Sequence, residues 1–381
     1  MTDLTKPMRI AVVAVIPTPY RDPFWAALAA LPGIELDVFY CAGSKADRPW
    51  VANWEMAYPH QVLPGWNLLK FWRADASFYL NPSMVRMLKR KPYQAILVAG
   101  YNHPSMWAAL SYARRASIPC YMMCETWRQK RGNGLKALLQ RKLVNWSFQR
   151  VAGGLPTGQL AARYLVDCGL KRANLFHLPN VPDIAHIKNR MEEAERMRAA
   201  LREKWGVKNE HLTLFVGRWI PKKRVVHLIE SFAKLPDRRD RRLVLVGDGP
   251  ERENVHAAIE RFDMKDEVML PGFLQPEEVL DWYGAVDLFV QPSAETWGVA
   301  VIEAAAAGLP VVISDQAGCH PDLAATWPAT QVYAGDDLNA LTDGLATPPV
   351  RPEHSDHLSA WYHAALAVGL VEFLTMQRCF V

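Results

Sequence analysis

The feature that most constrains the fold is a repeated alternation between short apolar runs and longer stretches with helical periodicity. Aliphatic and β-branched runs indicate strands buried on both faces, and the helical stretches between them indicate crossover connections. The alternation therefore predicts an α/β architecture in which helices cover parallel sheets. The predicted strands are residues 9–16, 34–40, 95–100, 118–124, 150–155 and 175–178 in the first half, and 212–216, 243–247, 268–270, 288–291 and 311–314 in the second.

Two such series predict two domains. Two prolines within residues 179–183 interrupt any regular element, and a charged helical stretch follows over 185–205. We predict a strongly basic Rossmann-like domain over residues 1–183 and a second Rossmann-like domain over 184–350. The remaining residues, 351–381, are predicted to form a helix that packs back on the first domain. With a hinge at the boundary, the two sheets would face a cleft between the domains.

Composition excludes several classes of protein. The six cysteines of the 381-residue chain are scattered, without the spacing of a zinc site or a disulfide scaffold, so we expect reduced thiols. The first apolar run ends at Pro17 and is too short for a signal-peptide core, and no run reaches the ~20 apolar residues that a membrane span needs. We therefore expect a cytoplasmic protein.

The charge is distributed unevenly. Residues 1–180 contain 23 Lys and Arg against 9 Asp and Glu, a net +14, whereas residues 181–381 contain 21 against 30, a net −9. A basic half attracts an anionic membrane, a phosphorylated substrate or nucleic acid. Residues 128–146 mix basic side chains with Leu and Trp at partly helical spacing. This pattern fits a helix lying on an anionic leaflet, and it equally fits a packed helix with a solvated basic face.

Common nucleotide-binding motifs are absent. The chain has no Gly-x4-Gly-Lys-Ser/Thr motif, and Gly247-Asp248-Gly249 lacks the third glycine of a dinucleotide fingerprint. These absences argue against a kinase, a GTPase and a typical dehydrogenase. No Asp-x-Asp pair occurs either, so we expect no metal held by carboxylates on a sugar diphosphate.

Residues 286–312 carry the most informative pattern. A predicted strand leads into a loop, and a helix is predicted to begin near Gly298 and to end before a Gly-Leu-Pro sequence. A helix that starts beyond the carboxyl end of a strand is a site for anions. The backbone N–H groups of Trp297, Gly298 and Val299 are predicted to point at such a ligand.

Four charged residues accompany these loops. Glu295 precedes the predicted helix and Glu303 lies in its second turn, among apolar neighbours where an unpaired carboxylate is costly. We therefore favour a ligand-binding role for Glu303 over that of a solvated surface residue. Arg218 and Lys223 follow another predicted strand, where two cations can hold a diphosphate and neutralise its charge as it leaves. On spacing alone, a solvated basic loop is equally consistent.

Together these motifs resemble the retaining family 4 glycosyltransferases of GT-B fold. The resemblance is specific over residues 217–318. It rests on Gly217-Arg218 with Lys223, on Leu243-Val-Leu-Val-Gly-Asp-Gly-Pro, on Leu270-Pro-Gly-Phe and on Glu295-x7-Glu303 followed by Ala-Gly-Leu-Pro-Val-Val. More loosely, Pro17-Thr-Pro-Tyr-Arg and Pro179-Asn180 resemble members that build bacterial surface polysaccharides.

The resemblance implies a function and a role for each matching residue. A sugar would pass from a nucleotide-diphosphate sugar, a UDP- or GDP-sugar, to an acceptor hydroxyl with retention and without a metal. Arg218 and Lys223 would clamp the diphosphate, Glu303 would bind the ribose hydroxyls, and Glu295 would bind the transferred sugar. His103 would lie near the reacting sugar. The residues implied to line the donor are Gly217, Leu274, Thr296, Trp297, Gly298 and Val299.

Two positions depart from the family pattern. The glycine that usually follows the clamp lysine is Arg224 here, which either adds a phosphate contact or crowds the site. Pro17, Thr18 and Pro19 replace the glycine-rich turn that often follows the first strand, and Arg21 offers a cation beyond them.

The expected acceptor is a lipid-linked or polysaccharide precursor of a cell-envelope glycan, reached from the inner face of the membrane. Two rivals stay open: a catalytically silent subunit that binds a protein or nucleic acid, and an epimerase or phosphorylase of the same fold. The four charged residues argue against silence. No recognised nucleic-acid-binding module appears, so we expect no nucleic-acid partner. The base, the sugar and the acceptor stay open.

Overall fold

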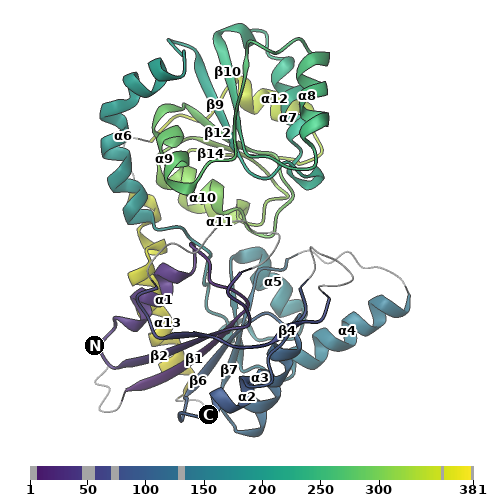
Figure 1. Cartoon of the computed structure of the whole chain (residues 1–381), viewed down its shortest axis with the longest axis vertical. Helices are drawn as coiled ribbons and strands as arrows, with labels where there is room; N and C mark the ends of the chain where they lie inside the picture. The colour runs from purple at the N-terminus through teal and green to yellow at the C-terminus, as the bar shows by residue number, and fades with distance from the viewer. Residues whose placement is uncertain (1–6, 45–55, 70–76, 128–133, 353–355, 379–381) are drawn as a thin grey trace. The chain divides into compact units, whose positions relative to one another are not determined.

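The computed structural model describes residues 7–44, 56–69, 77–127, 134–352 and 356–378 (Figure 1). The chain divides into two compact units. Unit 1 comprises Met1–Pro182 and His363–Val381, and unit 2 comprises Asp183–Tyr362. Unit 2 thus continues beyond residue 350, where the sequence placed its end, and the chain that follows it belongs to unit 1.

Unit 1 is built on a six-stranded parallel sheet with the order β3-β2-β1-β6-β7-β8. Its strands are β1 (Met8–Ala14), β2 (Ile34–Tyr40), β3 (His60–Val62), β6 (Ala95–Ala99), β7 (Cys120–Cys124) and β8 (Gly153–Pro156). The prediction of a strand at 175–178 is wrong, because only Leu175 forms an isolated bridge, with Gly154. The edge strand β3 was not predicted, because all three of its residues are exposed and the apolar pattern is missing.

Helices cover both faces of this sheet. On one face α1 (Asp22–Ala29) packs against α13 (His363–Arg378). The Phe373 ring of α13 lies 5.6 Å from that of Tyr121 and 5.7 Å from that of Phe176. The opposite core is lined by α2 (Met84–Leu88), α3 (Pro104–Arg115), α4 (Leu135–Phe148) and α5 (Gln159–Asp167). A short antiparallel ribbon joins β4 (Trp66–Asn67) to β5 (Tyr79–Leu80), and η1 is Arg172–Asn174.

Unit 2 repeats this plan, with a six-stranded parallel sheet of order β11-β10-β9-β12-β13-β14. The strands are β9 (His211–Val216), β10 (Arg241–Val246), β11 (Val268–Gly272), β12 (Leu288–Gln291), β13 (Val311–Ser314) and β14 (Thr330–Tyr333). All five strands predicted for this half are confirmed. The edge strand β14 was missed because polar and partly exposed residues break its apolar run.

The helices of unit 2 also form two layers (Figure 1). One core contains α7 (Val225–Ala233), α8 (Arg252–Arg261) and α12 (Leu338–Ala346). On the other side, α6 (Ile184–Lys204) contacts α9 (Pro276–Ala285) and α10 (Val299–Ala306). The remaining helical segments are α11 (His320–Thr326), η2 (Pro221–Lys223), η3 (Arg238–Asp240) and η4 (Asp356–Trp361).

Three further expectations concern the chain as a whole. In the described part of the chain, no helix is long and apolar enough to cross a membrane. The cysteines that the structure describes are free thiols, four of them buried. Of the basic stretch 128–146, residues 128–133 lie outside the described residues and the rest belong to α4.

Candidate active site

Two loops at one edge of the unit 2 sheet carry the predicted charged residues. β9 and β12 are neighbouring parallel strands, so the loops that follow them leave the sheet at the same edge, where ligands of open α/β sheets bind. The backbone joins these loops directly, since the N–H of Ala294 donates to the carbonyl of Lys222 over 2.9 Å. This bond brings the β9 loop and the β12 loop together.

The centre of this edge is an ion pair between Lys223 and Glu295. The Lys223 Nζ lies 2.5 Å from the Glu295 Oε1, and both side chains are largely buried, with 12% and 17% of their surfaces exposed. The Gln291 side-chain amide donates to the same carboxylate oxygen. Gln291 is the last residue of β12 and is fully buried. The carboxylate is therefore held from two sides.

Electrostatics keep this carboxylate ionised. Burial alone raises the pKa of Glu295. The adjacent Lys223 ammonium and the hydrogen bonds from Lys223 and Gln291 outweigh burial, so that the pKa lies below its ordinary value of 4.5. Each residue is thus the other's partner in the structure, whereas the sequence assigned them to separate parts of the donor.

Close packing of the first loop depends on glycine. A Cβ at Gly217 would lie 3.5 Å from the Lys223 Nζ and 3.2 Å from the Phe215 ring. Gly247, which has a φ of +130°, approaches Gly217 even more closely, because a Cβ there would lie 2.0 Å from the Gly217 carbonyl oxygen. The β10 loop can therefore approach the β9 loop this closely only with glycine at position 247. Arg218, next to Gly217, has an exposed side chain.

Glu303 lies on α10 and faces a tyrosine of α9. Its Oε2 accepts a hydrogen bond from the Tyr283 hydroxyl over 3.0 Å. Burial raises the pKa of Glu303, and the hydrogen bond from Tyr283 opposes this shift. The site therefore holds two carboxylates with opposite pKa shifts. Glu303 is not a freely solvated surface residue, although it keeps some exposure.

The other predicted donor residues surround the start of α10. Gly298 is its N-cap, with a φ of +127°, and Val299 is its first residue. Trp297 is buried and its ring lies 6.1 Å from that of Trp361, whereas Thr296 is exposed.

The loop before α10 is fastened to the loop after β13. The N–H of Glu295 donates to the Gln316 carbonyl and the N–H of Gly318 donates to the Glu295 carbonyl, each over 3.0 Å. After β11, Leu274 is partly buried, and the neighbouring Phe273 is 59% exposed.

His103 belongs to unit 1, where it is the N-cap of α3. The side chain is buried, and its Nδ1 accepts the backbone N–H of Tyr79 over 3.2 Å. A nitrogen that accepts this bond carries no proton, so the proton of the neutral ring is on Nε2. In this tautomer His103 is a hydrogen-bond donor through Nε2.

A second polar group in unit 1 joins three sequence positions that lie far apart. The Arg21 guanidinium donates to the Asn180 side-chain oxygen, and the Asn180 side-chain nitrogen donates to Glu125 Oε1 over 2.6 Å. Burial lowers the pKa of Arg21 to about 10, although Glu125 opposes the shift. Arg21 therefore stays charged at neutral pH, and its charge is engaged within unit 1.

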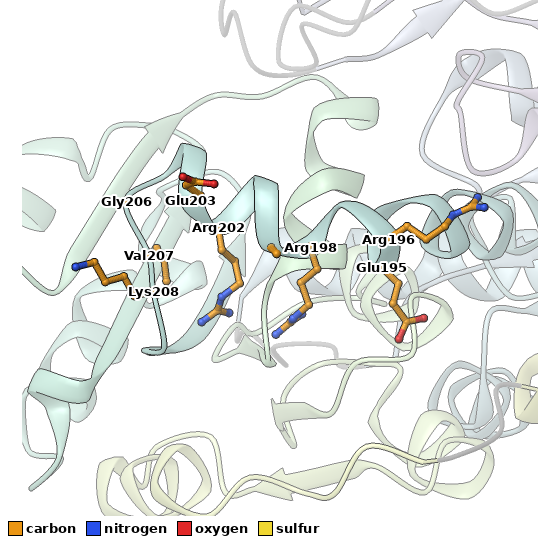
Figure 2. Close-up of a pocket in the computed structure, with 9 residues that line it drawn as sticks. Glu195, Arg196, Arg198, Arg202, Glu203, Gly206, Val207 and Lys208 are labelled. Carbon is orange, nitrogen blue, oxygen red and sulfur yellow. The ribbon is translucent and has the colours of Figure 1, made fainter.

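A pocket of about 730 Å³ lies beside the end of α6, away from these loops. In Figure 2, Arg198 and Arg202 project from the same side of α6. Arg198 donates to the carbonyls of Gly284 and Val286, and Arg202 donates to that of Ala285. Both also pair with Asp287. These two arginines bind the carbonyl groups at the carboxyl end of α9, so we assign the residues of this pocket a structural role.

Sequence reasoning therefore located Gly217, Lys223 and Glu295, which the structure brings together. It missed Gln291 and Tyr283, which hold the two carboxylates. Gln291 had a usable signal, because it is a polar residue at the carboxyl end of an otherwise apolar strand. Tyr283 had none, since an aromatic residue in an amphipathic helix is ordinarily part of the core.

Comparison with known proteins adds a family match. Residues 197–346, which lie within unit 2, match the family of group 1 glycosyl transferases. The matched part contains Lys223, Glu295 and Glu303. Among curated relatives, alpha-D-kanosaminyltransferase of Streptomyces kanamyceticus is 30% identical over 43% of this chain and 39% of its own length. The 2-deoxystreptamine glucosyltransferase of the same organism is 26% identical over 58% of this chain and 60% of its own length. The chain thus matches less than two thirds of the length of each of these relatives.

The fold is shared more widely. The crystal structure of HepE from Anabaena in complex with UDP covers 97% of both chains, with a TM-score of 0.67 at 17% identity. This likeness and the two six-stranded parallel sheets confirm the predicted GT-B fold class.

Proposed function

We propose that this protein is a retaining glycosyltransferase that moves a sugar from a nucleotide-diphosphate sugar to an acceptor hydroxyl. Unit 2 binds the donor, and unit 1 binds the acceptor. The observation that carries the proposal is the buried Lys223–Glu295 pair, supported by Gln291, at the carboxyl edge of the unit 2 sheet. The group 1 match over this region supports the same reading.

Each charged residue has a task in this reaction. Lys223 and Arg218 bind the diphosphate and neutralise the negative charge that grows on it as the bond to the sugar breaks. Glu295 accepts hydrogen bonds from hydroxyls of the sugar, and Glu303 accepts those of the ribose. Because Lys223 and Glu295 touch each other, they place the diphosphate and the sugar side by side.

Retention is compatible with a carboxylate nucleophile or with attack on the same face, and we propose same-face attack because the family pattern offers no nucleophile at a suitable place. The bond between the anomeric carbon and the β-phosphate oxygen breaks, and the acceptor oxygen bonds to the same carbon on the same face. The acceptor proton passes to an oxygen of the departing diphosphate. We propose that no metal takes part, with Arg218, Lys223 and the start of α10 supplying the counter-charge.

The proposed acceptor is a lipid-linked or polysaccharide precursor of a cell-envelope glycan. The basic first half supports a location on the inner face of an anionic membrane. Binding to anionic vesicles should weaken as salt is raised. Equal binding to neutral vesicles would remove this part of the proposal.

Two other functions remain as rivals: that of a nucleotide-sugar epimerase and that of a catalytically silent binding subunit. An epimerase would convert the donor with no acceptor present, and a silent subunit would leave it unchanged. The Glu295-x7-Glu303 loop together with the Arg218 and Lys223 pair favours transfer from a nucleotide sugar.

The test measures melting temperature with UDP-, GDP-, ADP- and dTDP-sugars for the wild type and for Glu303→Ala. A donor at 100 times its Kd should stabilise by about 2.7 kcal/mol. A shift with one nucleotide class that Glu303→Ala loses supports the proposal. Transfer assays with that donor then follow the anomeric configuration by NMR, with and without EDTA. If no nucleotide sugar stabilises the folded wild type, the proposal is wrong.

A further inference from the structure

Arg224 departs from the family pattern, and the structure shows where its side chain lies. Its backbone is left-handed, with φ 54° and ψ 37°, at the junction between η2 and α7. Residues that carry a side chain rarely adopt this backbone conformation, whereas glycine adopts it without strain. The conformation lets the turn end at Lys223 and the next helix begin at Val225. A residue other than glycine persists here because its side chain makes compensating contacts.

Those contacts reach three other loops of the same sheet edge. The Arg224 side chain is only 15% exposed. Its Nη1 donates to the Gly335 carbonyl over 2.5 Å and to the Pro292 carbonyl over 3.5 Å. Its Nη2 donates to Gln316 Oε1 and to Asp336, each over 2.9 Å. Through this guanidinium, the loops after β12, β13 and β14 are joined to the β9 loop next to Lys223.

One of these contacts leads back to the ion pair. The side-chain oxygen of Gln316 accepts a hydrogen bond from the Arg224 guanidinium. The backbone carbonyl of Gln316 accepts a hydrogen bond from the N–H of Glu295. Arg224 thus lies beside Lys223 in the chain and acts on Glu295 through Gln316. Its hydrogen bonds go to backbone and side-chain oxygens of unit 2.

We infer that Arg224 is a positioning residue that fixes Lys223 and Glu295 in the geometry that binds the diphosphate and sugar of the donor. The inference rests on the proposed function, because it concerns that same site. A small displacement of two groups that grip adjacent parts of one ligand weakens binding strongly. Removing the guanidinium should therefore weaken the binding of nucleotide sugars more than that of nucleoside monophosphates.

The chain provides a matched control in Arg241. This arginine is 11% exposed, donates to the carbonyls of Leu345 and Ala346, and pairs with Asp237. It makes the same kinds of contact as Arg224 but stands at the first residue of β10, at the opposite end of that strand from the loops of the site. Arg241→Ala thus reports the cost of losing a buried arginine alone.

A second variant reaches the guanidinium from the other side. A Cβ at Gly335 would lie 2.9 Å from the Arg224 Nη1 and 2.4 Å from Ser314 Oγ. A Cβ there would also lie 2.9 Å from Gln316 Cγ, so Gly335→Ala crowds Ser314, Gln316 and the Arg224 guanidinium together while residue 224 stays arginine. Arg224→Gly complements it, because glycine relieves the left-handed backbone and favours folding without the side chain.

The experiment titrates wild type, Arg224→Gly, Arg224→Ala, Gly335→Ala and Arg241→Ala with UDP-glucose, GDP-mannose, UMP and GMP, and records each melting temperature. For the three site variants we expect the Kd for the bound nucleotide sugar to rise about tenfold, with the Kd for the monophosphate within about twofold of wild type. Arg241→Ala should lower the melting temperature and leave both Kd values unchanged.

Each result decides one claim. Wild-type affinity in Arg224→Gly and Arg224→Ala overturns the inference and leaves the proposed function standing. An equal loss in Arg241→Ala also overturns it, because general destabilisation then explains the effect. If the wild type binds no nucleotide sugar, the proposed function fails and the inference fails with it.

Discussion

The Tyr283 hydroxyl, on α9, donates a hydrogen bond to Glu303, on α10, over 3.0 Å. Tyr283 is buried, and burial together with the neighbouring carboxylate raises its pKa well above 10. The hydroxyl therefore keeps its proton at neutral pH and remains a hydrogen-bond donor to Glu303. The carboxylate of Glu303 gains a fixed direction from a residue that has no part in the family motif.

Tyr283→Phe should weaken donor binding. Phenylalanine keeps the packing of the ring but removes the hydrogen bond that lowers the pKa of Glu303, so this pKa should rise further. We expect a loss of about 1–2 kcal/mol in stability and a shift of the acidic limb of donor binding to higher pH. Calorimetric titration with a nucleotide sugar between about pH 5 and 8 measures it.

The control for this prediction is Tyr112→Phe. The hydroxyl of Tyr112 donates to the Leu88 carbonyl in unit 1. Its loss should affect stability without moving the pH dependence of donor binding. The same pH shift in both variants would contradict the role of Tyr283.

Replacement of Lys223 should slow catalysis. If its ammonium stabilises the leaving diphosphate, Lys223→Ala should lower turnover by about 10² to 10³. Lys222→Ala is the matched control, because Lys222 is the exposed lysine next to it. Steady-state rates of both variants with saturating donor decide the point, and wild-type turnover in Lys223→Ala would remove the role.

The two carboxylates should have opposite effects on the pH dependence of stability. The folded-state pKa of Glu295 is lowered, so its ionisation stabilises the fold above its ordinary pKa of 4.5, and this contribution is lost as the pH falls through the folded value. The folded-state pKa of Glu303 is raised, so its protonated form stabilises the fold. This stabilisation is fully present below the ordinary pKa of 4.5 and is lost as the pH rises through the folded-state pKa.

Urea denaturation from about pH 8 to pH 3 tests these signs. Relative to wild type, Glu295→Gln should be most destabilised near pH 7, with the difference narrowing as the pH falls. Glu303→Gln should become more favourable relative to wild type as the pH rises. Parallel pH profiles for the two variants and the wild type would contradict both assignments.

Asn180→Ala should destabilise unit 1. The substitution removes the side-chain partner of both Arg21 and Glu125 and leaves a buried guanidinium with fewer acceptors, at an expected cost of about 1–3 kcal/mol. Asn174→Ala serves for comparison, because Asn174 makes an exposed hydrogen bond to the Ala152 carbonyl. Chemical denaturation should show the larger loss of stability for Asn180→Ala, and equal losses would show that the Asn180 contacts add no more stability than an exposed hydrogen bond.

The sequence predicted the central strands well because burial on both faces leaves an unbroken apolar run, as in Leu288–Gln291 and Val311–Ser314. It failed at two of the four sheet edges, β3 and β14, although it predicted the edge strands β8 and β11. There a strand needs hydrogen bonds on one side only, and an exposed segment such as His60–Val62 carries no apolar signal.

The site divides in the same way. Lys223 and Glu295 were singled out because each follows a predicted strand, and the family resemblance then assigned both to the donor. Spacing could not reveal that they bind each other, since that depends on how two loops meet. The contacts of Arg224 lie 68 to 112 positions away along the chain, and local patterns do not reach across such separations.

The last helix of the chain decides when unit 1 can be completed. Unit 2 is one continuous stretch and is synthesised before α13, which supplies Phe373 to the core around Tyr121 and Phe176. On the ribosome, domains usually fold in the order in which they emerge. Here unit 1 begins before unit 2 but is completed only after it, when α13 has been synthesised and can pack on the rings of Tyr121 and Phe176. A nascent chain stalled before His363 is therefore a natural target for chaperones.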